Sequence, residues 1–485
     1  MIECSGSFII SQGQNDLFAK LSGDFNPLHV DRNYARRLQF GRPVIHGVHH
    51  LLRVIDESLA ALPELTSLSI LSLRGRFQNP AWVGHEVIYS SSYNPDDYLL
   101  SISASCDDRS IIDIKLKLKS AHTPVQIIDL ENNCPPHEAP LEQEFPPVNP
   151  SGTLGLYLEL DVLASLFPRL ARSFPPIQLA QILSTTRVVG MRCPGLHSIF
   201  SGLSLNFDAP GEKGGKLHYF TSKADARVKL LNIAVKSEGL EGVLTTFFRP
   251  KPVIQPDYEE VRGRSAGNEY QGQRALVVGG TRGLGEVTAK LLAAGGASVT
   301  LTYHQGEAEA CRVADEINVG GGSCTRIRLD VTCLDQLPHM AELPTHIYYF
   351  ASPHIDANRS SEWSDALFQR FLTYYINAFS NIVTWRQKQA EPAESVTYFY
   401  PSSEYVVSPE RGFAEYATAK GAAEVFCGQL ATRYPNSRFV CLRLPRVLTD
   451  QTASIIPIAC ESALDVMLKA LPLSLGDALD TVASN

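Results

Sequence analysis

The sequence predicts a multidomain chain in which two α+β units are followed by an α/β unit with a doubly wound parallel sheet. The chain has 485 residues, which is too long for a single hydrophobic core. Two polar stretches, 123–150 and 257–271, have the composition of linkers. After residue 272 strand and helix patterns alternate, which is typical of a parallel sheet. The predicted units are therefore 1–122, 151–256 and 272–485.

The overall composition is that of a globular protein, with 44% hydrophobic and 19% charged residues. A net charge of -8 argues against broad contact with nucleic acid or with an anionic membrane. No apolar stretch approaches the ~20 residues that span a bilayer, and the first residues, MIECSGSFII, lack the features of a signal peptide. The ten cysteines show no C-x-x-C pair and no zinc-binding spacing. We therefore expect a cytoplasmic protein with reduced cysteines, no metal and no membrane or nucleic-acid partner.

The first unit combines one helix with antiparallel strands. Pro43 begins the predicted helix and Pro63 ends it, and apolar residues recur between them at helical spacing, namely Val48, Leu52, Ile55, Leu59 and Leu62. A strand is predicted at 112–119, where every second residue is apolar. A helix followed by such strands indicates an α+β unit.

The second unit repeats features of the first. Residues 76–80 are echoed by 206–210, and residues 99–102 are echoed by 230–233. The two offsets, 130 and 131 residues, nearly agree, as an internal duplication requires.

The third unit opens with a buried strand, 274–278, that leads into a glycine-rich turn and a helix. Glycines there allow a tight turn, a close approach of the backbone to a pyrophosphate and close packing of helix on strand. We expect this turn to contact a dinucleotide through Gly279, Thr281, Arg282, Gly283, Leu284 and Gly285. A glycine turn alone is weak evidence, and the strand–turn–helix context strengthens it.

Further motifs follow in order: Asp330 at the end of a later strand, Asn377, Ser403, and Tyr416 with Lys420 in Y-x-x-x-K. With the G-x-x-x-G-x-G turn, residues 273–460 resemble the short-chain dehydrogenase/reductase family. The resemblance implies a Rossmann-type fold and a nicotinamide cofactor. It also implies further cofactor contacts at Tyr303, His304, Asp330, Val331, Ala351, Ser352 and Thr449.

The resemblance implies a catalytic role for four of these residues. Reduction of a carbonyl leaves an alkoxide that needs a proton, which Tyr416 would donate. Lys420, one helical turn away, would lower the pKa of the phenol. Ser403 would hold the carbonyl oxygen, and Asn377 would support a water relay behind Lys420. Taken alone, Tyr416 and Lys420 could be an ordinary pair on a helix surface, but the joint motif set favours catalysis.

The expected cofactor is NADP(H). Family members that use NAD carry an acidic residue after the second strand, whereas residues 302–305 here are Thr-Tyr-His-Gln. Arg282 in the glycine turn could meet a 2′-phosphate. The chain departs from the family at Val278, at 350–352 (Phe-Ala-Ser) and at 445–446 (Pro-Arg), so the substrate of the reductase stays open.

Near the N-terminus, residues 24–29 read D-x-N-P-x-H and residues 40–47 read F-G-x-x-x-x-H-G. Together they make residues 8–120 resemble the MaoC-like (R)-specific enoyl-CoA hydratases, which have a hot-dog fold. The resemblance implies that Asp24 activates water and that His29 transfers the partnered proton. Asn26, His46 and Gly47 would bind substrate, with the thioester oxygen near the N–H of Gly47. The plainer interpretation, in which Asp24 and Asn26 only cap a turn, suits an isolated D-x-N better than the whole pattern.

The second unit lacks D-x-N-P-x-H, and Pro175-Pro176-Ile177-Gln178-Leu179 replaces the corresponding helix start. We interpret it as a degenerate half of a double hot-dog. The leading functional hypothesis is reduction of a 3-oxoacyl thioester, carried by CoA or a carrier protein, followed by reversible dehydration to the enoyl thioester. Two alternatives remain: a reductase for a sugar or polyketide-like carbonyl with a separate dehydration, and a hot-dog pair that only binds acyl groups or dimerises. A homo-oligomer is expected by resemblance.

Overall fold

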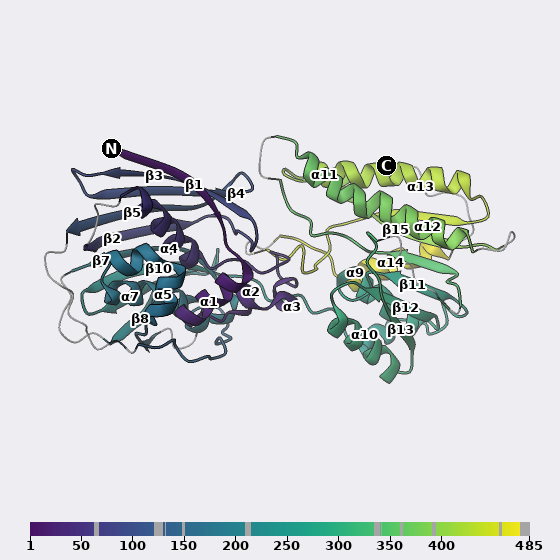
Figure 1. Ribbon diagram of the computed structural model, residues 1–485. Helices are drawn as coiled ribbons and strands as arrows, with labels where there is room; N and C mark the ends of the chain where they lie inside the picture. The colour runs from purple at the N-terminus through teal and green to yellow at the C-terminus, as the bar shows by residue number, and fades with distance from the viewer. Residues whose placement is uncertain are drawn as a thin grey trace. The chain divides into compact units, whose positions relative to one another are not determined.

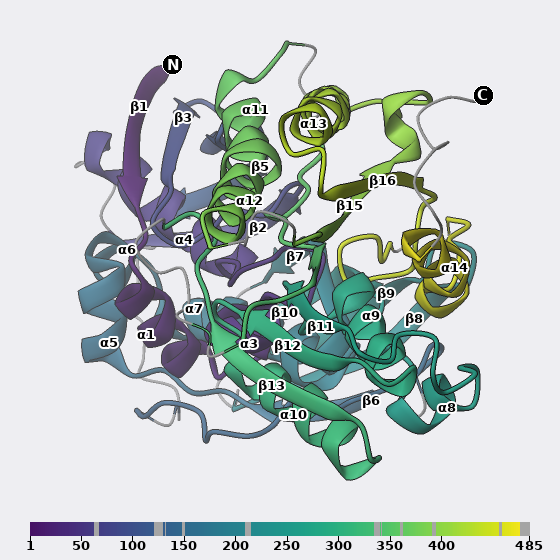
Figure 2. The same cartoon turned by 90° about the vertical axis from the view of Figure 1, so that its right-hand side faces the viewer.

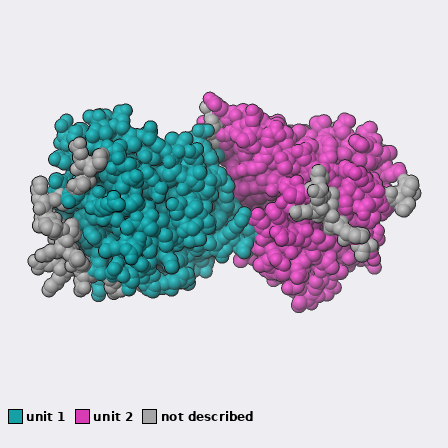
Figure 3. All heavy atoms as spheres, in the orientation of Figure 1, with its two compact units in different colours: residues 1–251, 454–457 teal, residues 252–453, 458–485 magenta. Residues whose placement is uncertain are grey.

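The computed structural model describes residues 1–62, 67–120, 130, 132–147, 151–208, 215–333, 340, 342–358, 362–389, 394–454 and 458–475. The chain forms two compact units (Figure 3). Unit 1 holds residues 1–251 and 454–457, and unit 2 holds residues 252–453 and 458–485.

Unit 1 contains one sheet with the strand order β1-β3-β4-β5-β2-β7-β10-β9-β8-β6. Within the described residues, neighbouring strands of this sheet pair antiparallel. The two halves of the sheet have equivalent orders. Read from one edge inward the order is β1-β3-β4-β5-β2, and read from the other edge inward it is β6-β8-β9-β10-β7. The strands are β1 (Ile2–Ile9), β2 (Leu68–Phe77), β3 (Glu86–Asn94), β4 (Leu99–Cys106), β5 (Arg109–Ser120), β6 (Ser151–Gly155), β7 (Ser198–Phe207), β8 (Lys216–Asp225), β9 (Leu230–Ser237) and β10 (Leu240–Phe248).

The halves join where β2 pairs with β7, from Ser72 opposite Asn206 to Arg76 opposite Gly202. The segments that echo one another in sequence begin on equivalent strands: Arg76-Phe77 and Asn206-Phe207 end β2 and β7, and residues 99–102 and 230–233 open β4 and β9. The strand predicted at 112–119 lies within β5, where Ile112, Ile114, Leu116 and Leu118 are buried.

The main helices of unit 1 are α4 (Gly47–Ser58) and α7 (Pro176–Arg187), one in each half, and both contribute to a single hydrophobic core with the strands (Figure 1). The remaining helical segments are α1 (Gln12–Ser22), α2 (Pro27–Val30), α3 (Arg32–Ala35), η1 (Leu59–Ala61), α5 (Leu160–Leu166), α6 (Pro168–Ser173), the π-helical turn η2 (Val188–Arg192) and η3 (Gly195–His197).

The helix start predicted at Pro43 is wrong by four residues. Val44 forms a β-bridge with Trp82, and the backbone becomes helical only at Gly47, after His46 as N-cap. The predicted end at Pro63 lies outside the described residues. Since α7 begins at Pro176 after Pro175, Pro175 takes the place that His46 has in the first half.

The two stretches expected to be linkers carry structure of their own. In 123–150, Leu141 donates its N–H to Met191 and accepts one from Leu196. In 257–271, α8 (Tyr258–Arg262) buries Tyr258 and Val261 in the core of unit 2.

Unit 2 is built on a six-stranded parallel sheet with the order β13-β12-β11-β14-β15-β16. Its strands are β11 (Arg274–Val278), β12 (Ser298–Tyr303), β13 (Ser323–Arg328), β14 (His346–Tyr349), β15 (Thr397–Ser403) and β16 (Arg438–Leu444). From β11 the chain adds β12 and β13 on one side, and then returns to add β14, β15 and β16 on the other side of β11. This is the strand order of dinucleotide-binding sheets. The predicted doubly wound α/β fold is confirmed.

Helices cover both faces of this sheet (Figure 2). One core includes α8, α9 (Gly283–Ala294), α10 (Glu307–Val319) and α14 (Ala463–Ala470). The other includes α11 (Asp365–Leu372), α12 (Phe379–Gln387) and α13 (Ala414–Arg433). Among the described residues, none of the helices combines the length and the apolar character that crossing a membrane requires.

Candidate active sites

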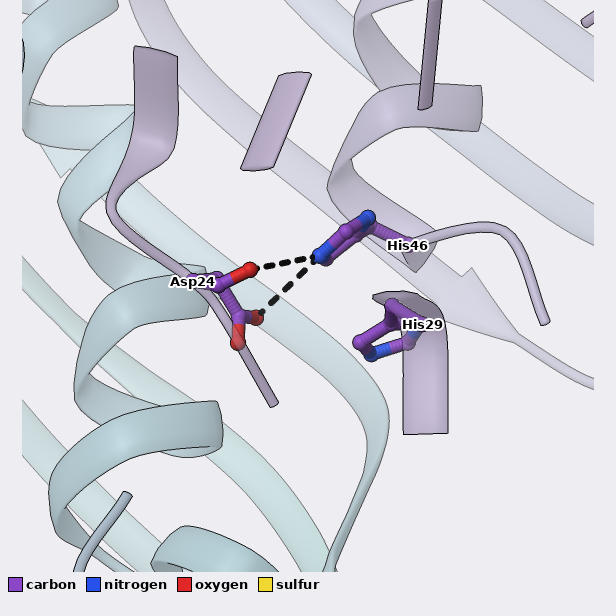
Figure 4. Close-up of side chains that lie close together, drawn as sticks. All are labelled: Asp24, His29 and His46. Carbon is purple, nitrogen blue, oxygen red and sulfur yellow. Dashed lines mark hydrogen bonds and ion pairs between the residues drawn. The ribbon is translucent and has the colours of Figure 1, made fainter. Parts of the chain in front are cut away.

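The first site lies in unit 1, where Asp24, His29 and His46 converge (Figure 4). Ligand atoms of the three side chains lie within 4.8 Å of one another. The Nε2 atom of His46 lies 2.9 Å from the backbone oxygen of Asp24 and 4.0 Å from its carboxylate. The rings of His29 and His46 stack with centroids 3.8 Å apart. The structure thus brings the two sequence motifs together at one point.

Short local elements hold these side chains in place. Helix α1 ends at Ser22 and is capped by Gly23, whose φ of 73° is a left-handed conformation that favours glycine. The chain turns there, and Asp24 is buried. Asn26 caps α2 by accepting the N–H of Leu28, and its amide donates to the backbone oxygens of Gly190 and Gly195. The Asn26 side chain therefore fixes the turn between α1 and α2 against the second half of unit 1.

His29 is oriented by a 2.6 Å hydrogen bond between its Nδ1 and the backbone oxygen of Val44. A carbonyl oxygen can only accept, so Nδ1 carries the proton. In the neutral ring the Nε2 atom then keeps its lone pair. This tautomer is the one that a general base needs.

Burial shifts the pKa of each group in this cluster towards its neutral form. Burial raises the pKa of Asp24, and this rise is opposed by the charge of His29 and by hydrogen bonds from Thr186 and Asn26. Burial lowers the pKa of His29 and sets that of His46 well below its ordinary value. The pKa values of the carboxyl group and the imidazoles are thereby brought closer together, which suits proton exchange through a shared water.

The second half of unit 1 supplies two contacts to Asp24 that no sequence motif indicates. The hydroxyl of Thr186, on α7, donates to Asp24 Oδ2 over 2.6 Å. At Gly190 a Cβ atom would lie 2.1 Å from Asp24 Oδ1, so only glycine fits. In the first half, Asn15 also contributes, with its Oδ1 atom 3.2 Å from His46 Nδ1. These residues belong to no motif, and only the fold assembles them.

The same three side chains have a spacing that could hold a metal ion, as do His85, Cys106 and Asp107. In the first cluster, however, the two nitrogens of His46 and the Nδ1 atom of His29 already face oxygen atoms of the protein within 3.2 Å, namely Asn15 Oδ1 and the backbone oxygens of Asp24 and Val44. Only one imidazole nitrogen of the pair is left to coordinate a cation. The geometry therefore favours proton transfer over metal binding.

Gly47 is the first residue of α4, next to His46. N–H groups in a first helical turn have no acceptor within the helix, so they can bind an oxygen that carries negative charge. A side chain at this position would meet the ring of Phe77 at 3.0 Å.

The second site lies in unit 2, where β15 ends at Ser403 and α13 carries Tyr416 and Lys420 one turn apart. The hydroxyl of Ser403 is close enough to the phenol of Tyr416 to lower its pKa. Lys420 is buried, and its Nζ donates to the backbone oxygen of Pro401 over 2.7 Å. The three predicted residues therefore come from two adjacent elements and converge.

The expected effect of Lys420 on Tyr416 is not what the structure shows. Burial raises the pKa of Tyr416, and the hydroxyl of Ser403 is the influence that lowers it. The ammonium of Lys420 lies instead over the rings of Tyr375 and Tyr400, at 4.1 and 4.8 Å. Burial lowers the pKa of Lys420 itself to about 8.

The expectation for Asn377 needs correction. The segment Thr373–Ala378 is a π-helical turn, in which Asn377 is exposed and Tyr375 is buried. Because the wider turn changes which residues face the sheet, Tyr375 rather than Asn377 lies against Lys420. The hydroxyl of Tyr375 lies 2.8 Å from Ser352 Oγ, so Ser352 is linked to Lys420 through this ring.

The glycine turn between β11 and α9 depends on its glycines. Gly279 and Gly283 have φ values of 81° and 56°, in the left-handed region. A Cβ atom at Gly285 would lie 2.2 Å from the backbone oxygen of Gly279, so helix and strand pack too closely for a side chain. Thr281 is buried, and Leu284 packs against the core of this face. Arg282 is the N-cap of α9, 3.9 Å from Asp450.

The remaining predicted cofactor contacts lie at the carboxyl ends of neighbouring parallel strands, where ligands bind in such sheets. Tyr303 ends β12, and His304 pairs with Asp330 at 3.4 Å. Val331 is buried next to it. Ala351 and Ser352 follow β14, and the backbone N–H of Ala351 comes within 3.1 Å of where a Gly279 Cβ would be. A Cβ atom at Gly283 would lie 3.3 Å from the methyl group of Thr449.

Comparisons with known families agree with the motifs. The MaoC like domain model matches residues 4–88, and the short chain dehydrogenase model matches residues 273–345. The chain therefore contains one segment similar to MaoC-like domains and one similar to short chain dehydrogenases, and the two predicted resemblances are confirmed over these residues.

Two curated relatives match the N-terminal part. The (R)-specific enoyl-CoA hydratase of Aeromonas caviae is 42% identical over 72 residues, which cover 14% of this chain and 52% of the relative. The peroxisomal enoyl-CoA hydratase 2 of Arabidopsis thaliana is 31% identical over 78 residues, covering 16% and 25%. This chain thus spans about half or less of the length of the relatives it matches.

Solved structures match part of the chain. A short chain dehydrogenase of Escherichia coli CFT073, complexed with NADPH, is 22% identical with a TM-score of 0.39, and the match covers 44% of this chain and 93% of that chain. L-sorbose reductase of Gluconobacter frateurii, complexed with NADPH and L-sorbose, is 18% identical with a TM-score of 0.34, covering 37% and 71%.

Proposed function

We propose that the chain is a bifunctional enzyme that reduces a 3-oxoacyl thioester with NADPH and dehydrates the 3-hydroxyacyl product to the enoyl thioester. The observation that supports the proposal is that one chain holds two separate clusters of side chains whose chemistry suits proton transfer. One is Asp24 with His29, and the other is Tyr416 with Ser403 and Lys420. A 3-hydroxyacyl thioester is the product of the second chemistry and the substrate of the first.

The dehydration site is the simpler of the two. In dehydration, His29 Nε2 takes the proton from the α-carbon, and Asp24 in its protonated form gives a proton to the 3-hydroxyl group, whose bond to carbon breaks as water leaves. In hydration both proton transfers run in reverse. Negative charge that develops on the thioester oxygen is stabilised by the N–H of Gly47 at the start of α4. The equivalence of the two halves supports a double hot-dog in which the second half, through Thr186 and Gly190, shapes the site of the first.

In unit 2 the glycine turn fits a dinucleotide pyrophosphate, because Gly279 and Gly285 let the backbone and the α9 N-terminus approach it. The cofactor supplies a hydride when bound. Tyr416 donates the proton to the carbonyl oxygen, and Ser403 holds that oxygen. Lys420, one helical turn after Tyr416, donates to the backbone oxygen of Pro401 and lies over the ring of Tyr375. Arg282, together with the lack of an acid at 302–305, favours NADPH over NADH.

A different carbonyl substrate is favoured by one observation. Arg446, in place of the usual glycine, donates to Tyr405 Oη over 3.0 Å, and the Tyr405 ring packs edge-on against Tyr416. Arg446 also pairs with Glu410 at 3.3 Å, so a polar cluster lies behind the proposed proton donor, which would suit a sugar or polyketide-like substrate with polar groups near its carbonyl.

The test is a spectrophotometric assay of the purified chain. Acetoacetyl-CoA should support oxidation of NADPH, and crotonyl-CoA should be hydrated without any nicotinamide. If NADPH is oxidised only with sugar or polyketide-like ketones, the alternative substrate class holds. If Asp24→Ala leaves hydration of crotonyl-CoA as it was, the assignment of that site is wrong.

A further inference from the structure

Arg249 is a buried cation without a counter-charge, placed beside the dehydration site by the second half of unit 1. It directly follows β10, and its side chain is 3% exposed. No carboxylate of the described residues lies within ion-pair distance of it. Placing a charge out of water without a partner is unfavourable, so such an arginine needs an explanation.

The contacts of Arg249 use only part of its guanidinium group. Its Nη2 donates to the backbone oxygen of Leu196 over 2.5 Å and to Tyr34 Oη over 3.2 Å. The Nε and Nη1 atoms are buried and have no hydrogen-bond partner within the described part of the chain. Each of these two free nitrogens can donate to one oxygen of a carboxylate or phosphate.

This guanidinium group is close to the proposed reacting groups. Asn26 donates to the same Leu196 oxygen, over 3.3 Å, and the Asn26 N–H donates to Asp24 Oδ1. Tyr34 lies on α3, directly after the segment that carries His29. The positive charge of Arg249 also lowers the pKa of His29, which places its field at that ring.

We propose, on the basis of the proposed dehydratase function, that Arg249 is a specificity-determining residue that binds an oxyanion group of the acyl thioester. The oxyanion is either a phosphate of the CoA or phosphopantetheine carrier or a carboxylate at the far end of the acyl chain. In both cases the second half of unit 1, which lacks the catalytic motif, supplies the group that selects the substrate.

Three substrates distinguish the sources: crotonyl-CoA, crotonyl-N-acetylcysteamine without phosphates, and glutaconyl-N-acetylcysteamine with an acyl carboxylate only. Arg249→Gln should raise KM tenfold or more for the one that carries the recognised anion, with less than a twofold change for the neutral thioester. Arg249→Lys, which keeps the charge, should restore part of the loss. A rise for crotonyl-CoA alone assigns the phosphate, and a rise for the glutaconyl substrate alone assigns the carboxylate.

Arg169→Gln is the matched control, since Arg169 of the same half already pairs with Asp56 at 3.1 Å. It should leave the ratio of KM values between the substrates unchanged. An equal effect of Arg249→Gln on all three substrates, or no effect, would show a structural arginine and overturn the proposal.

Failure of the dehydratase function is a separate outcome. If the wild-type chain hydrates none of the three thioesters, calorimetry with butyryl-CoA and glutaryl-N-acetylcysteamine still tests Arg249. Weaker binding of one of them to Arg249→Gln than to the wild type supports the anion site, and equal binding contradicts it.

Discussion

The hydroxyl of Thr186 donates a 2.6 Å hydrogen bond to the carboxylate of Asp24, 162 residues earlier in the chain. Asp24 belongs to the half of unit 1 that carries the D-x-N-P-x-H motif, and Thr186 belongs to the half that lacks it. The two halves are joined through β2 and β7 into one sheet, so a contact of this kind is fixed by the fold. The proposed site is therefore completed by the half without the motif.

Replacing Thr186 with valine should slow hydration of crotonyl-CoA and move the acidic limb of its pH profile to higher pH. A hydrogen bond to a charged group contributes about 1.5–3 kcal/mol, which corresponds to about one to two pH units. Burial already raises the pKa of Asp24, and loss of this donor raises it further. The measurement is kcat against pH.

Thr185→Val is the matched control for that change. Thr185 is equally buried on α7, but its hydroxyl donates to the backbone oxygen of Ile182 within the helix. If both variants shift the profile alike, the effect comes from the helix and not from Asp24.

Tyr416→Phe should reduce NADPH-dependent reduction by about 10²–10⁴-fold, because the proton donor to the carbonyl oxygen is lost. Hydration of crotonyl-CoA should stay at the wild-type rate. Steady-state assays of both reactions on the same preparation check this. Tyr434→Phe, at the end of α13, serves as the control and should retain both activities. A Tyr416→Phe enzyme with normal reduction would remove Tyr416 from the mechanism.

The pH dependence of reduction should reflect Lys420, whose pKa is lowered by burial to about 8. The ammonium is present below that pH and is lost as the pH rises through it, so the rate should hold below about pH 8 and fall above. Lys420→Met should abolish this alkaline limb together with most of the activity. A rate that is flat from pH 7 to pH 10 would be inconsistent with a role for the Lys420 charge.

Gly285→Ala should prevent dinucleotide binding, because the added methyl group would lie 2.2 Å from the backbone oxygen of Gly279 and force α9 away from β11. Fluorescence titration with NADPH measures the loss. Gly428→Ala on α13, where nothing lies within 4 Å of the added carbon, is the control and should bind normally. Normal affinity in Gly285→Ala would place the cofactor elsewhere.

The parts of this structure that the sequence predicted are those with local signals. The strand–turn–helix pattern at 274–294 predicted the parallel sheet, and the short spacing of Asp24 and His29 predicted one cluster. Thr186, Gly190 and Arg249 could not be predicted, because they reach the cluster only through the pairing of two half-sheets. Tyr375, and not Asn377, lies against Lys420 because of a π-helical turn. Such a turn adds one residue to a helical turn and leaves no recognisable pattern in the sequence.

The most direct test of the two-site account is mass spectrometry of the products formed from acetoacetyl-CoA and NADPH. The wild-type chain should give a mixture of 3-hydroxybutyryl-CoA and crotonyl-CoA, and Asp24→Asn should give 3-hydroxybutyryl-CoA alone. Tyr416→Phe should return the substrate unchanged. Formation of crotonyl-CoA by Asp24→Asn, or unreacted acetoacetyl-CoA with the wild-type chain, would contradict the account.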